Sequence, residues 1–463
     1  MNMSTNILSI TLIVALGGLL FGYDTAVISG ANEALRAYFS LSPAELGFAV
    51  SSTLIGCVLG AVIAGKISDN LGRKKALLIA SVLFFLSAIG TAVPDSITVF
   101  ILFRILGGVG VGIASIVSPM YIAEIAPSNK RGALVSCNQF CIILGMLVVY
   151  FVNYYIALLG SELWLNSIGW RYMFASMTIP ASAFFLLMFL VPDTPRWLLM
   201  NGRVEEAKKI VSSINKTEES FQREWSEIER SLKQPVKTTS SEEQTSFSRL
   251  MKHKYLLFCG ILLAVLQQAT GINVFLYYAP TILKDLSEGG MDIALLLTIV
   301  IGIVNVTSTV VAIMKIDKWG RKPLMISGAL VMGISMFALG TGAYTNNIGM
   351  YMFVFILTYI AAFAVSLGPV TWVLISEIFP SHIRSQAISL CVFLLWIANF
   401  IVSQTFPMMN DANSWLYKEF NGGFPFWLYG AMCFITILVV YKMLPETKGK
   451  SLEEVESIVT FRH

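Results

Sequence analysis

Twelve long apolar stretches restrict what this chain can fold into. A helix needs about 20 mostly apolar residues to cross a bilayer, and six such stretches lie on each side of a polar stretch at 193–254. They run near 8–30, 45–65, 76–93, 97–122, 133–158, 171–191, 255–283, 292–314, 323–344, 350–376, 386–408 and 424–444. Only 13% of the 463 residues are charged, against about 25% in soluble domains. The sequence predicts an all-α membrane protein with twelve transmembrane helices.

The distribution of Lys and Arg predicts the orientation of these helices. Basic residues gather in the even-to-odd loops, in the polar stretch and in the C-terminal tail, whereas the opposite loops hold only Arg36, Arg171, Lys284 and Lys418. Because cytoplasmic loops carry the excess of Lys and Arg, we expect both termini and the polar stretch to be cytoplasmic.

Three short motifs occur once in each half of the chain, in the same order. D-x-x-G-R-K begins at Asp69, and a second copy begins at Asp317. Glu124-I-A-P-S-N-K-Arg131 is matched by Glu377-I-F-P-S-H-I-Arg384, and P-D-T-P-R at 192–196 by P-E-T-K-G at 445–449. The chain is therefore read as a duplicated six-helix unit, the arrangement of transporters with two parallel repeats.

The domain boundaries follow from this repeat. We expect an N-terminal six-helix bundle at 1–192, a cytoplasmic linker at 193–254, a C-terminal bundle at 255–445 and a tail at 446–463. Within the linker, 203–214 and 219–232 show helical spacing of apolar residues and predict short amphipathic helices under the membrane.

The motifs together resemble those of the major facilitator superfamily, and within it the sugar porters. The resemblance rests on D-x-x-G-R-K together with P-D-T-P-R-W-L, Q-Q-A-T-G-I-N-x-x-x-Y-Y, G-P-V-T-W and P-E-T-K-G-K, and it covers about residues 8–457. It implies two pseudo-symmetric six-helix bundles in the major facilitator fold, and transport of a monosaccharide by alternating access.

Two charges lie inside predicted spans, Asp24 in the first and Arg104 in the fourth. Each costs about 2.5–3.5 kcal/mol at the bilayer centre on insertion scales, so we expect the charges to meet each other or water. One reading is a salt bridge that only holds two helices together. The other is a proton switch, because Arg104 favours the ionised carboxylate while desolvation favours the protonated one. The resemblance supports the switch, since symporters of the family carry Asp here and uniporters tend to carry Asn.

A set of neutral amides and aromatic side chains predicts the sugar site. Amides both donate and accept hydrogen bonds, as sugar hydroxyls require, and aromatic faces pack on the sugar ring. The resemblance carries the sugar contacts onto Phe21, Gln139, Gln267, Gln268, Asn273, Tyr277, Asn305, Trp372 and Trp396. For any single amide the alternative is a hydrogen bond between helices. Met146 and Leu395 stand where xylose-type symporters carry Gln, which leaves the identity of the sugar open.

Charged residues at the predicted cytoplasmic ends of the spans predict a gate. Its candidate members are Asp69, Arg73, Glu124, Arg131, Asp193, Asp317, Arg321, Glu377 and Arg384. Opposite charges at matched ends would bridge the two halves when the inside is closed. The alternative is surface charge that only sets topology, and the recurrence of the motifs argues against it.

Other classes of function find no support in the sequence. We expect no enzyme activity, no cofactor, no metal and no nucleic-acid partner, and we read the six cysteines as packing residues. G-G-V-G-V-G at 107–112 looks like a nucleotide loop but lies within a span, so it predicts close helix packing. The predicted partners are a monosaccharide, a proton and the lipid bilayer, with a monomer as the working form.

The sequence therefore predicts a proton-coupled monosaccharide symporter in the cell (inner) membrane, for D-xylose or a related aldose such as D-glucose. A facilitative uniporter is the first alternative, disfavoured by Asp24. A sugar sensor built on the same fold is the second; such sensors tend to carry long cytoplasmic tails.

Overall fold

The computed structural model describes residues 7–127, 130–215, 217–233, 251, 253–287, 290–347, 349–379 and 383–444. Helices account for most of these residues, and no strand occurs among them. Among the described residues, twelve segments are long and apolar enough to cross a membrane, which confirms the predicted number. Large apolar side chains of these segments are exposed, among them Leu102, Ile179 and Leu438, as a surface in contact with lipid requires.

Two compact units form, and they do not follow the sequence repeat. Unit 1 comprises Met1–Thr25, Gly56–Met146 and Phe174–Glu243, and unit 2 comprises Ala26–Ile55, Leu147–Met173 and Gln244–His463. Helices α1, α3, α6 and α8 therefore each contribute residues to both units.

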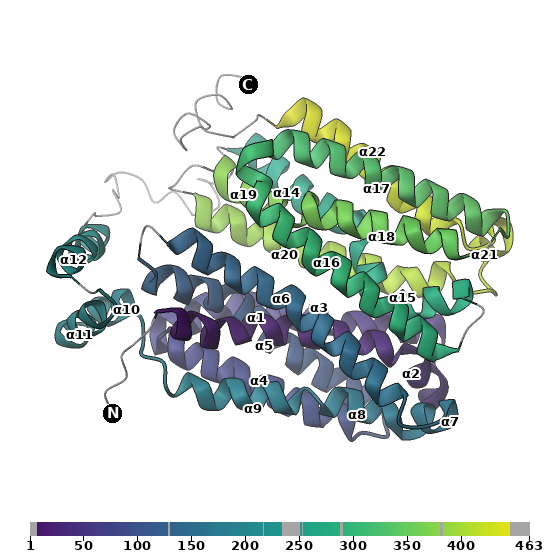
Figure 1. The fold of residues 1–463 in the computed structure, drawn as a ribbon, viewed down its shortest axis with the longest axis horizontal. Helices are drawn as coiled ribbons and strands as arrows, with labels where there is room; N and C mark the ends of the chain where they lie inside the picture. The colour runs from purple at the N-terminus through teal and green to yellow at the C-terminus, as the bar shows by residue number, and fades with distance from the viewer. Residues whose placement is uncertain are drawn as a thin grey trace. The chain divides into compact units, whose positions relative to one another are not determined.

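The first part of the chain builds unit 1 and also supplies two segments of unit 2. Its helices and their neighbours are α1 (Ile7–Val27), η1 (Ile28–Gly30), α2 (Asn32–Phe39), α3 (Pro43–Leu71), α4 (Arg73–Ala92), α5 (Ile97–Ile125), α6 (Arg131–Ala157), α7 (Glu162–Trp164), η2 (Leu165–Gly169), α8 (Trp170–Ala175), α9 (Thr178–Met188), α10 (Pro195–Met200), α11 (Val204–Ile214) and α12 (Glu218–Lys233). Within unit 1, α4 packs along both α5 and α9 (Figure 1).

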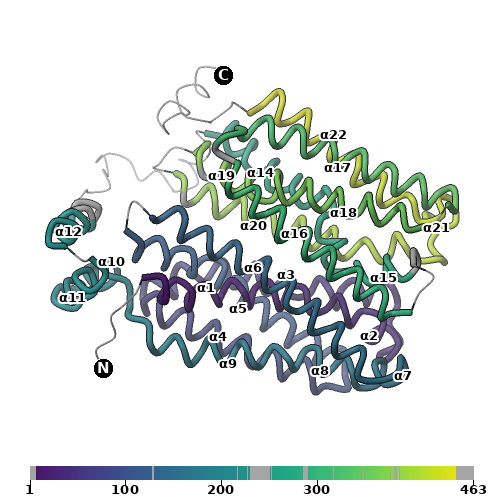
Figure 2. The backbone as a smooth tube through the Cα atoms, viewed as in Figure 1, coloured from purple at the N-terminus to yellow at the C-terminus, as the bar shows by residue number. Residues whose placement is uncertain are grey.

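Besides η1, α2, α7 and η2, unit 2 contains the remaining helices. They are α14 (Lys254–Ala269), α15 (Ile272–Ser287), α16 (Met291–Trp319), α17 (Arg321–Tyr344), α18 (Met350–Val365), α19 (Leu367–Ile378), α20 (Arg384–Met409), α21 (Trp415–Phe420) and α22 (Phe424–Met443). Helices α17 and α22 run side by side along their length (Figure 2).

Two spans that the sequence suggested were single helices are broken in unit 2. The seventh span divides into α14 and α15 at Thr270 and Gly271, where Gly271 takes a φ of +89°. The tenth divides into α18 and α19 at Ser366, which has φ −118° and ψ −93°. Pro369 follows within the first turn of α19, and because proline has no N–H it cannot donate a helical bond back to Val365.

Glycines in α5 allow close helix packing in unit 1. A Cβ on Gly112 would lie 2.7 Å from the amide nitrogen of Ala61 and 2.8 Å from the Cα of Gly60, both on α3. The close packing predicted for residues 107–112 is confirmed here, since small residues let two membrane helices approach.

The linker helices have a small apolar core of their own. Helices α11 and α12 match the two predicted amphipathic segments, and they lie with α10 beyond one end of the unit 1 helices (Figure 1). Buried side chains from the three helices pack together, namely Trp197, Leu198, Ala207, Val211, Trp225 and Ile228. Trp197 also donates a 2.8 Å hydrogen bond to the carbonyl of Asp69 at the end of α3. The packing fixes the linker to unit 1.

Candidate functional site

Asp24 on α1 and Arg104 on α5 meet inside unit 1. Arg104 Nη1 lies 3.3 Å from Asp24 Oδ1 and also donates to the Asp24 carbonyl at 3.2 Å. Both side chains are 1% exposed. Within the described residues, Asp24 Oδ2 and Arg104 Nε have no hydrogen-bond partner. The pair is therefore a single contact rather than the two parallel bonds of the strongest Arg–carboxylate pairs.

The neighbours of this pair are small or apolar. A Cβ on Gly107 would lie 3.3 Å from Asp24 Oδ1, so a glycine at 107 leaves room for the carboxylate. The Arg104 guanidinium lies 5.7 Å from the ring centroid of Phe174, within cation–π range. A buried charge with so few partners is costly, and a proton on Asp24 would remove the negative charge.

Three of the predicted sugar contacts form a chain of amides in unit 2. Asn273 Nδ2 donates to Gln268 Oε1, and Gln268 Nε2 lies 3.4 Å from Gln267 Oε1. Gln267 Nε2 in turn donates to the carbonyls of Leu367 at 2.9 Å and Gly368 at 3.2 Å, in the first turn of α19. The amides are buried, at 3% exposure for Gln267 and 7% for Gln268. The structure brings together residues from both broken spans.

The other predicted contacts are divided between the two units. In unit 2, Tyr277, Asn305 and Trp396 are buried, while the Trp372 side chain on α19 is 39% exposed. In unit 1, Phe21 and Gln139 are partly exposed. Met146 and Leu395, the two departures from the xylose-type pattern, are both buried.

The repeated motifs pair within each half of the chain. In unit 1, Arg73 donates from Nε and Nη2 to the two carboxylate oxygens of Glu124, at 3.0 and 2.9 Å. Thr194 Oγ1 donates to Glu124 Oε2 at 2.6 Å, and Arg73 Nη1 reaches Asp69 Oδ1 at 3.1 Å. The sequence put these residues at one end of their spans but did not predict that Arg73 and Glu124 are partners.

The second half repeats the pairing inside unit 2. Arg321 Nη2 lies 3.4 Å from Glu377 Oε1, and Arg384 Nε donates to the carbonyl of Phe379 at 3.1 Å. The side chain of Asp317, and the whole P-E-T-K-G segment at 445–449, lie outside the described residues. The Arg–Glu pair therefore occurs in both halves of the chain, in the sequence motifs and also as a side-chain contact.

Asp193 caps the start of α4. Its Oδ1 accepts from the backbone N–H groups of Lys74 at 3.3 Å and of Thr194 at 3.1 Å. Burial raises the pKa of the Asp193 carboxyl, while these backbone donors lower it by a smaller amount. The residue supplies the first turn of α4 with an acceptor that its N-cap, Gly72, cannot offer.

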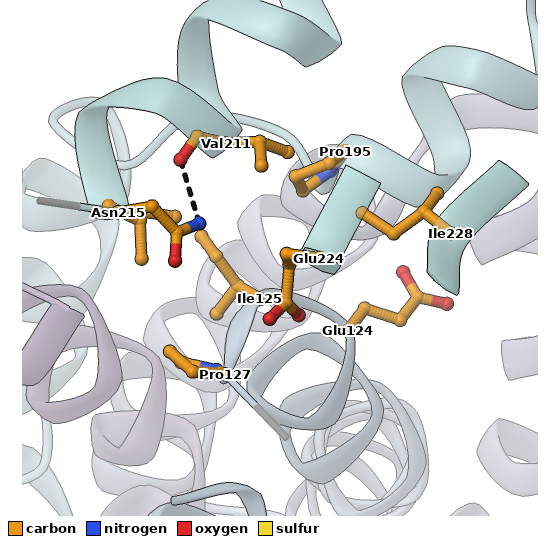
Figure 3. Close-up of a pocket in the computed structure, with 9 residues that line it drawn as sticks. Glu124, Ile125, Pro127, Pro195, Val211, Asn215, Glu224 and Ile228 are labelled. Carbon is orange, nitrogen blue, oxygen red and sulfur yellow. Dashed lines mark hydrogen bonds between the residues drawn. The ribbon is translucent and has the colours of Figure 1, made fainter. Parts of the chain in front are cut away.

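The Glu124 end of unit 1 also encloses space. A cavity of about 300 Å³ is lined by Met120, Ala123, Glu124, Arg131, Arg196, Glu224 and Ile228. Figure 3 shows the small neighbouring pocket, which is lined by Glu124 of α5, Pro127 just after α5, Asn215 just after α11 and Glu224 of α12. Two candidate gate residues, Glu124 and Arg131, therefore lie against the linker helix α12.

A group of ion pairs in unit 2 was missed by the sequence reasoning. Lys284 Nζ lies 2.6 Å from Glu33 and 3.4 Å from Glu162. Asn32 Nδ2 donates to the carbonyl of Tyr277 at 2.6 Å, and Tyr150 donates to that of Leu276 at 3.1 Å. These contacts join the first half of the chain to α15. Their only sequence signal was Lys284, one of the few basic residues in the odd-to-even loops.

Replacement of Glu124 by Ala is expected to destabilise the protein. The Arg73 side chain is 6% exposed, so the change leaves a buried cation without its main partner, at a cost of about 3–5 kcal/mol. Asp69→Ala is the matched control, because Asp69 also contacts Arg73 but is 63% exposed, and such a pair contributes about 1 kcal/mol or less. Thermal unfolding of the purified protein in detergent measures both. An equal fall in unfolding temperature in the two variants would show that the buried Arg73–Glu124 pair contributes no more stability than the exposed Arg73–Asp69 pair.

Twelve apolar spans with duplicated motifs, a buried ion pair and a chain of buried amides define a secondary membrane transporter. No group of three or more metal-ligating side chains occurs in the part of the chain that the structure describes. The family model for sugar (and other) transporters matches residues 10–459, and the chain belongs to this family. It is a transporter and not an enzyme.

Individual relatives and a solved structure agree with this assignment. The chain is 48% identical to the D-xylose-proton symporter of Escherichia coli K12, over 98% of this chain and 96% of that one. It is 41% identical to the arabinose-proton symporter of Bacillus subtilis, over 98% and 95%. The inward-open structure of the E. coli xylose transporter matches with a TM-score of 0.84 and 46% identity, over 98% and 99% of the two chains. The expected major facilitator fold is confirmed.

Proposed function

We propose that the protein is a proton-coupled monosaccharide symporter that imports D-xylose or a related aldose by alternating access. The observation that carries the proposal is the buried Asp24–Arg104 contact, with one carboxylate oxygen lacking a partner among the described residues. Protonation of Asp24 would end its ion pair with Arg104 and let α1 and α5 separate. The relatives named as proton symporters for xylose and arabinose support the same reading.

The roles of individual residues are part of this proposal. Gln267, Gln268 and Asn273 bind sugar hydroxyls, and Tyr277, Asn305, Trp372 and Trp396 complete the wall in unit 2. The contacts predicted for Phe21 and Gln139, in unit 1, stay predictions. So does the gate formed by the charged motif residues, although the pairing of Arg73 with Glu124 and of Arg321 with Glu377 supports a structural role for them.

The setting of the protein is proposed on the same basis. We place it in the inner membrane as a monomer, with both termini and the linker in the cytoplasm, as the distribution of Lys and Arg indicates. We also propose that the chain is divided functionally into an N-terminal bundle, a linker, a C-terminal bundle and a tail, at 1–192, 193–254, 255–445 and 446–463.

Uptake into membrane vesicles tests the proposed function. Labelled xylose, glucose and galactose are offered with an imposed proton gradient, with and without a protonophore. We expect accumulation of at least one of these sugars, and we expect the protonophore to abolish it. Entry that only equilibrates and ignores the protonophore would identify a facilitative uniporter instead. Entry of none of the three would remove the sugar assignment.

Loss of one amide is expected to weaken sugar binding about tenfold. Gln268→Ala leaves Asn273 without its acceptor and a sugar hydroxyl without a partner, at a cost of about 1–3 kcal/mol. Calorimetric titration of the purified protein measures the change. Gln222→Ala, an exposed amide on α12, is the control and should bind like the parent. Unchanged affinity in Gln268→Ala would place the sugar elsewhere.

A further inference from the structure

Ser87 on α4 has a hydroxyl group that can only accept a further hydrogen bond. Its side chain is fully buried, and its Oγ donates to the carbonyl of Phe103 on α5 at 2.9 Å. A serine hydroxyl has one hydrogen and two lone pairs, so the bond to Phe103 uses its only hydrogen. Phe103 directly precedes Arg104. The same bond therefore holds the serine oxygen next to the turn of α5 that carries the buried cation.

Gly107 keeps a space open between this serine oxygen and Asp24. A Cβ on Gly107 would overlap Ser87 Oγ and would lie 3.3 Å from Asp24 Oδ1. The two oxygens therefore face one small space from α4 and from α1, and all three residues belong to unit 1. A side chain at 107 would fill this space and separate Ser87 from Asp24.

Arg104 and Ser87 favour opposite protonation states of Asp24. Arg104 has only donors and lies 3.3 Å from Asp24 Oδ1, so it favours the ionised carboxylate. A protonated carboxyl has an O–H group instead, and a buried O–H group without an acceptor is costly. Among the described residues, the charged or titratable groups that interact electrostatically with Asp24 are Arg104 and the Cys57 thiol of α3. A thiol is only a weak acceptor.

We propose that Ser87 is a positioning residue that accepts a hydrogen bond from protonated Asp24 and so holds the proton-loaded form of the switch. The proton comes from the solution, binds one oxygen of the Asp24 carboxylate and returns to solution from the same oxygen. No other covalent bond forms or breaks. Asp24 thus exchanges its contact with Arg104 for one with Ser87 across the space at Gly107. The inference rests on the proposed proton coupling and adds the partner of Asp24 in its protonated form.

The pH dependence of sugar uptake tests this assignment. Initial uptake into vesicles is measured over a range of external pH at a fixed membrane potential. Ser87→Ala removes the acceptor, so protonation of Asp24 should need about a tenfold higher proton concentration, which moves the midpoint of the pH profile down by about one pH unit. Gly107→Ala fills the space and should move the midpoint in the same direction. Ser81→Ala should keep the profile of the parent, because Ser81 is a buried serine of α4 that donates to the carbonyl of Leu78 on its own helix.

Infrared spectroscopy of the parent protein tests the hydrogen bond itself. Spectra are compared above and below the pH at which the carboxyl titrates, and the carbonyl band that is lost in Asp24→Asn belongs to protonated Asp24. The carbonyl stretch of a carboxylic acid has a lower frequency when its O–H group is hydrogen-bonded. We expect a lowered frequency in the parent and in Ser81→Ala, and a higher frequency in Ser87→Ala.

Two results would overturn the role of Ser87. The first is an Asp24 band at the frequency of a free acid in the parent, which decides the matter even if no variant folds. The second is a folded Ser87→Ala protein with the pH profile of the parent. A different result bears on the proposed function: uptake by the parent that depends on neither external pH nor a protonophore would show that the proton coupling itself has failed.

Discussion

Asp24→Asn is expected to abolish uphill sugar uptake while sugar binding is kept. Asparagine has the size of the protonated aspartate and cannot ionise, so the contact with Arg104 is never restored as an ion pair. A driving force of about 150 mV on one charge amounts to about 3.5 kcal/mol, which sustains about 300-fold accumulation in the parent. In the variant the ratio of internal to external sugar concentration should fall to about one. Labelled-sugar uptake into energised vesicles measures the ratio, and calorimetry measures the retained binding.

A matched exposed carboxylate controls for the chemical change. Asp292, in the first turn of α16, is exposed, so Asp292→Asn should accumulate sugar like the parent. The variant Asp24→Asn should also lose the alkalinisation of the medium that accompanies sugar entry. Accumulation that persists in Asp24→Asn and stays sensitive to a protonophore would exclude Asp24 as the coupling group. Glu124 would then be the next carboxylate to examine.

Gly22→Val is expected to cost more folding stability than any other change considered. A Cβ at residue 22 of α1 would overlap the carbonyl oxygen of Ile142 and lie 2.8 Å from its carbonyl carbon. These are backbone atoms of α6, so no side chain can rotate away, and the two helices must separate. Overpacking of cores against side chains already costs about 1–3 kcal/mol. We expect little monodisperse protein on size-exclusion chromatography.

Gly65→Val provides the comparison for Gly22. Gly65 also lies in a membrane helix, α3, but nothing stands within 4 Å of a Cβ at that position. The variant should elute and unfold like the parent. A Gly22→Val protein with the elution profile and unfolding temperature of Gly65→Val would show that α1 and α6 are not held at the distance described.

The number of spans could be predicted because it depends on composition alone. Twelve apolar stretches are long enough to cross a membrane, and the part of the chain that the structure describes has twelve such helical segments. The breaks inside two spans were missed. An apolar window continues smoothly through Ser366 and Thr270, and the signals present, Pro369 and Gly271, are tolerated in continuous membrane helices as well.

Apart from the Asp24–Arg104 pair, the candidate site residues were predicted by residue type and not by partner. Asp24 and Arg104 were expected to meet each other or water because a lone charge in lipid is too costly, and they lie 3.3 Å apart. The partners of Gln267 are backbone carbonyls, which have no signature in a sequence. The Lys284 ion pairs were missed for a different reason, because Glu33 and Glu162 lie far from Lys284 along the chain and carry no motif.

The two glycines of the repeated D-x-x-G-R-K motif have nearly the same backbone conformation. Gly72 has φ +94° and ψ 156°, and Gly320 has φ +90° and ψ 152°, a region open to essentially no other residue. A side chain at 72 would in addition collide with the carboxylate of Asp193. In evolutionary terms, any of the other nineteen amino acids would strain the backbone at both positions, whatever its charge. The residues around these glycines differ between the two copies of the motif, whereas the turn itself leaves only glycine free of strain.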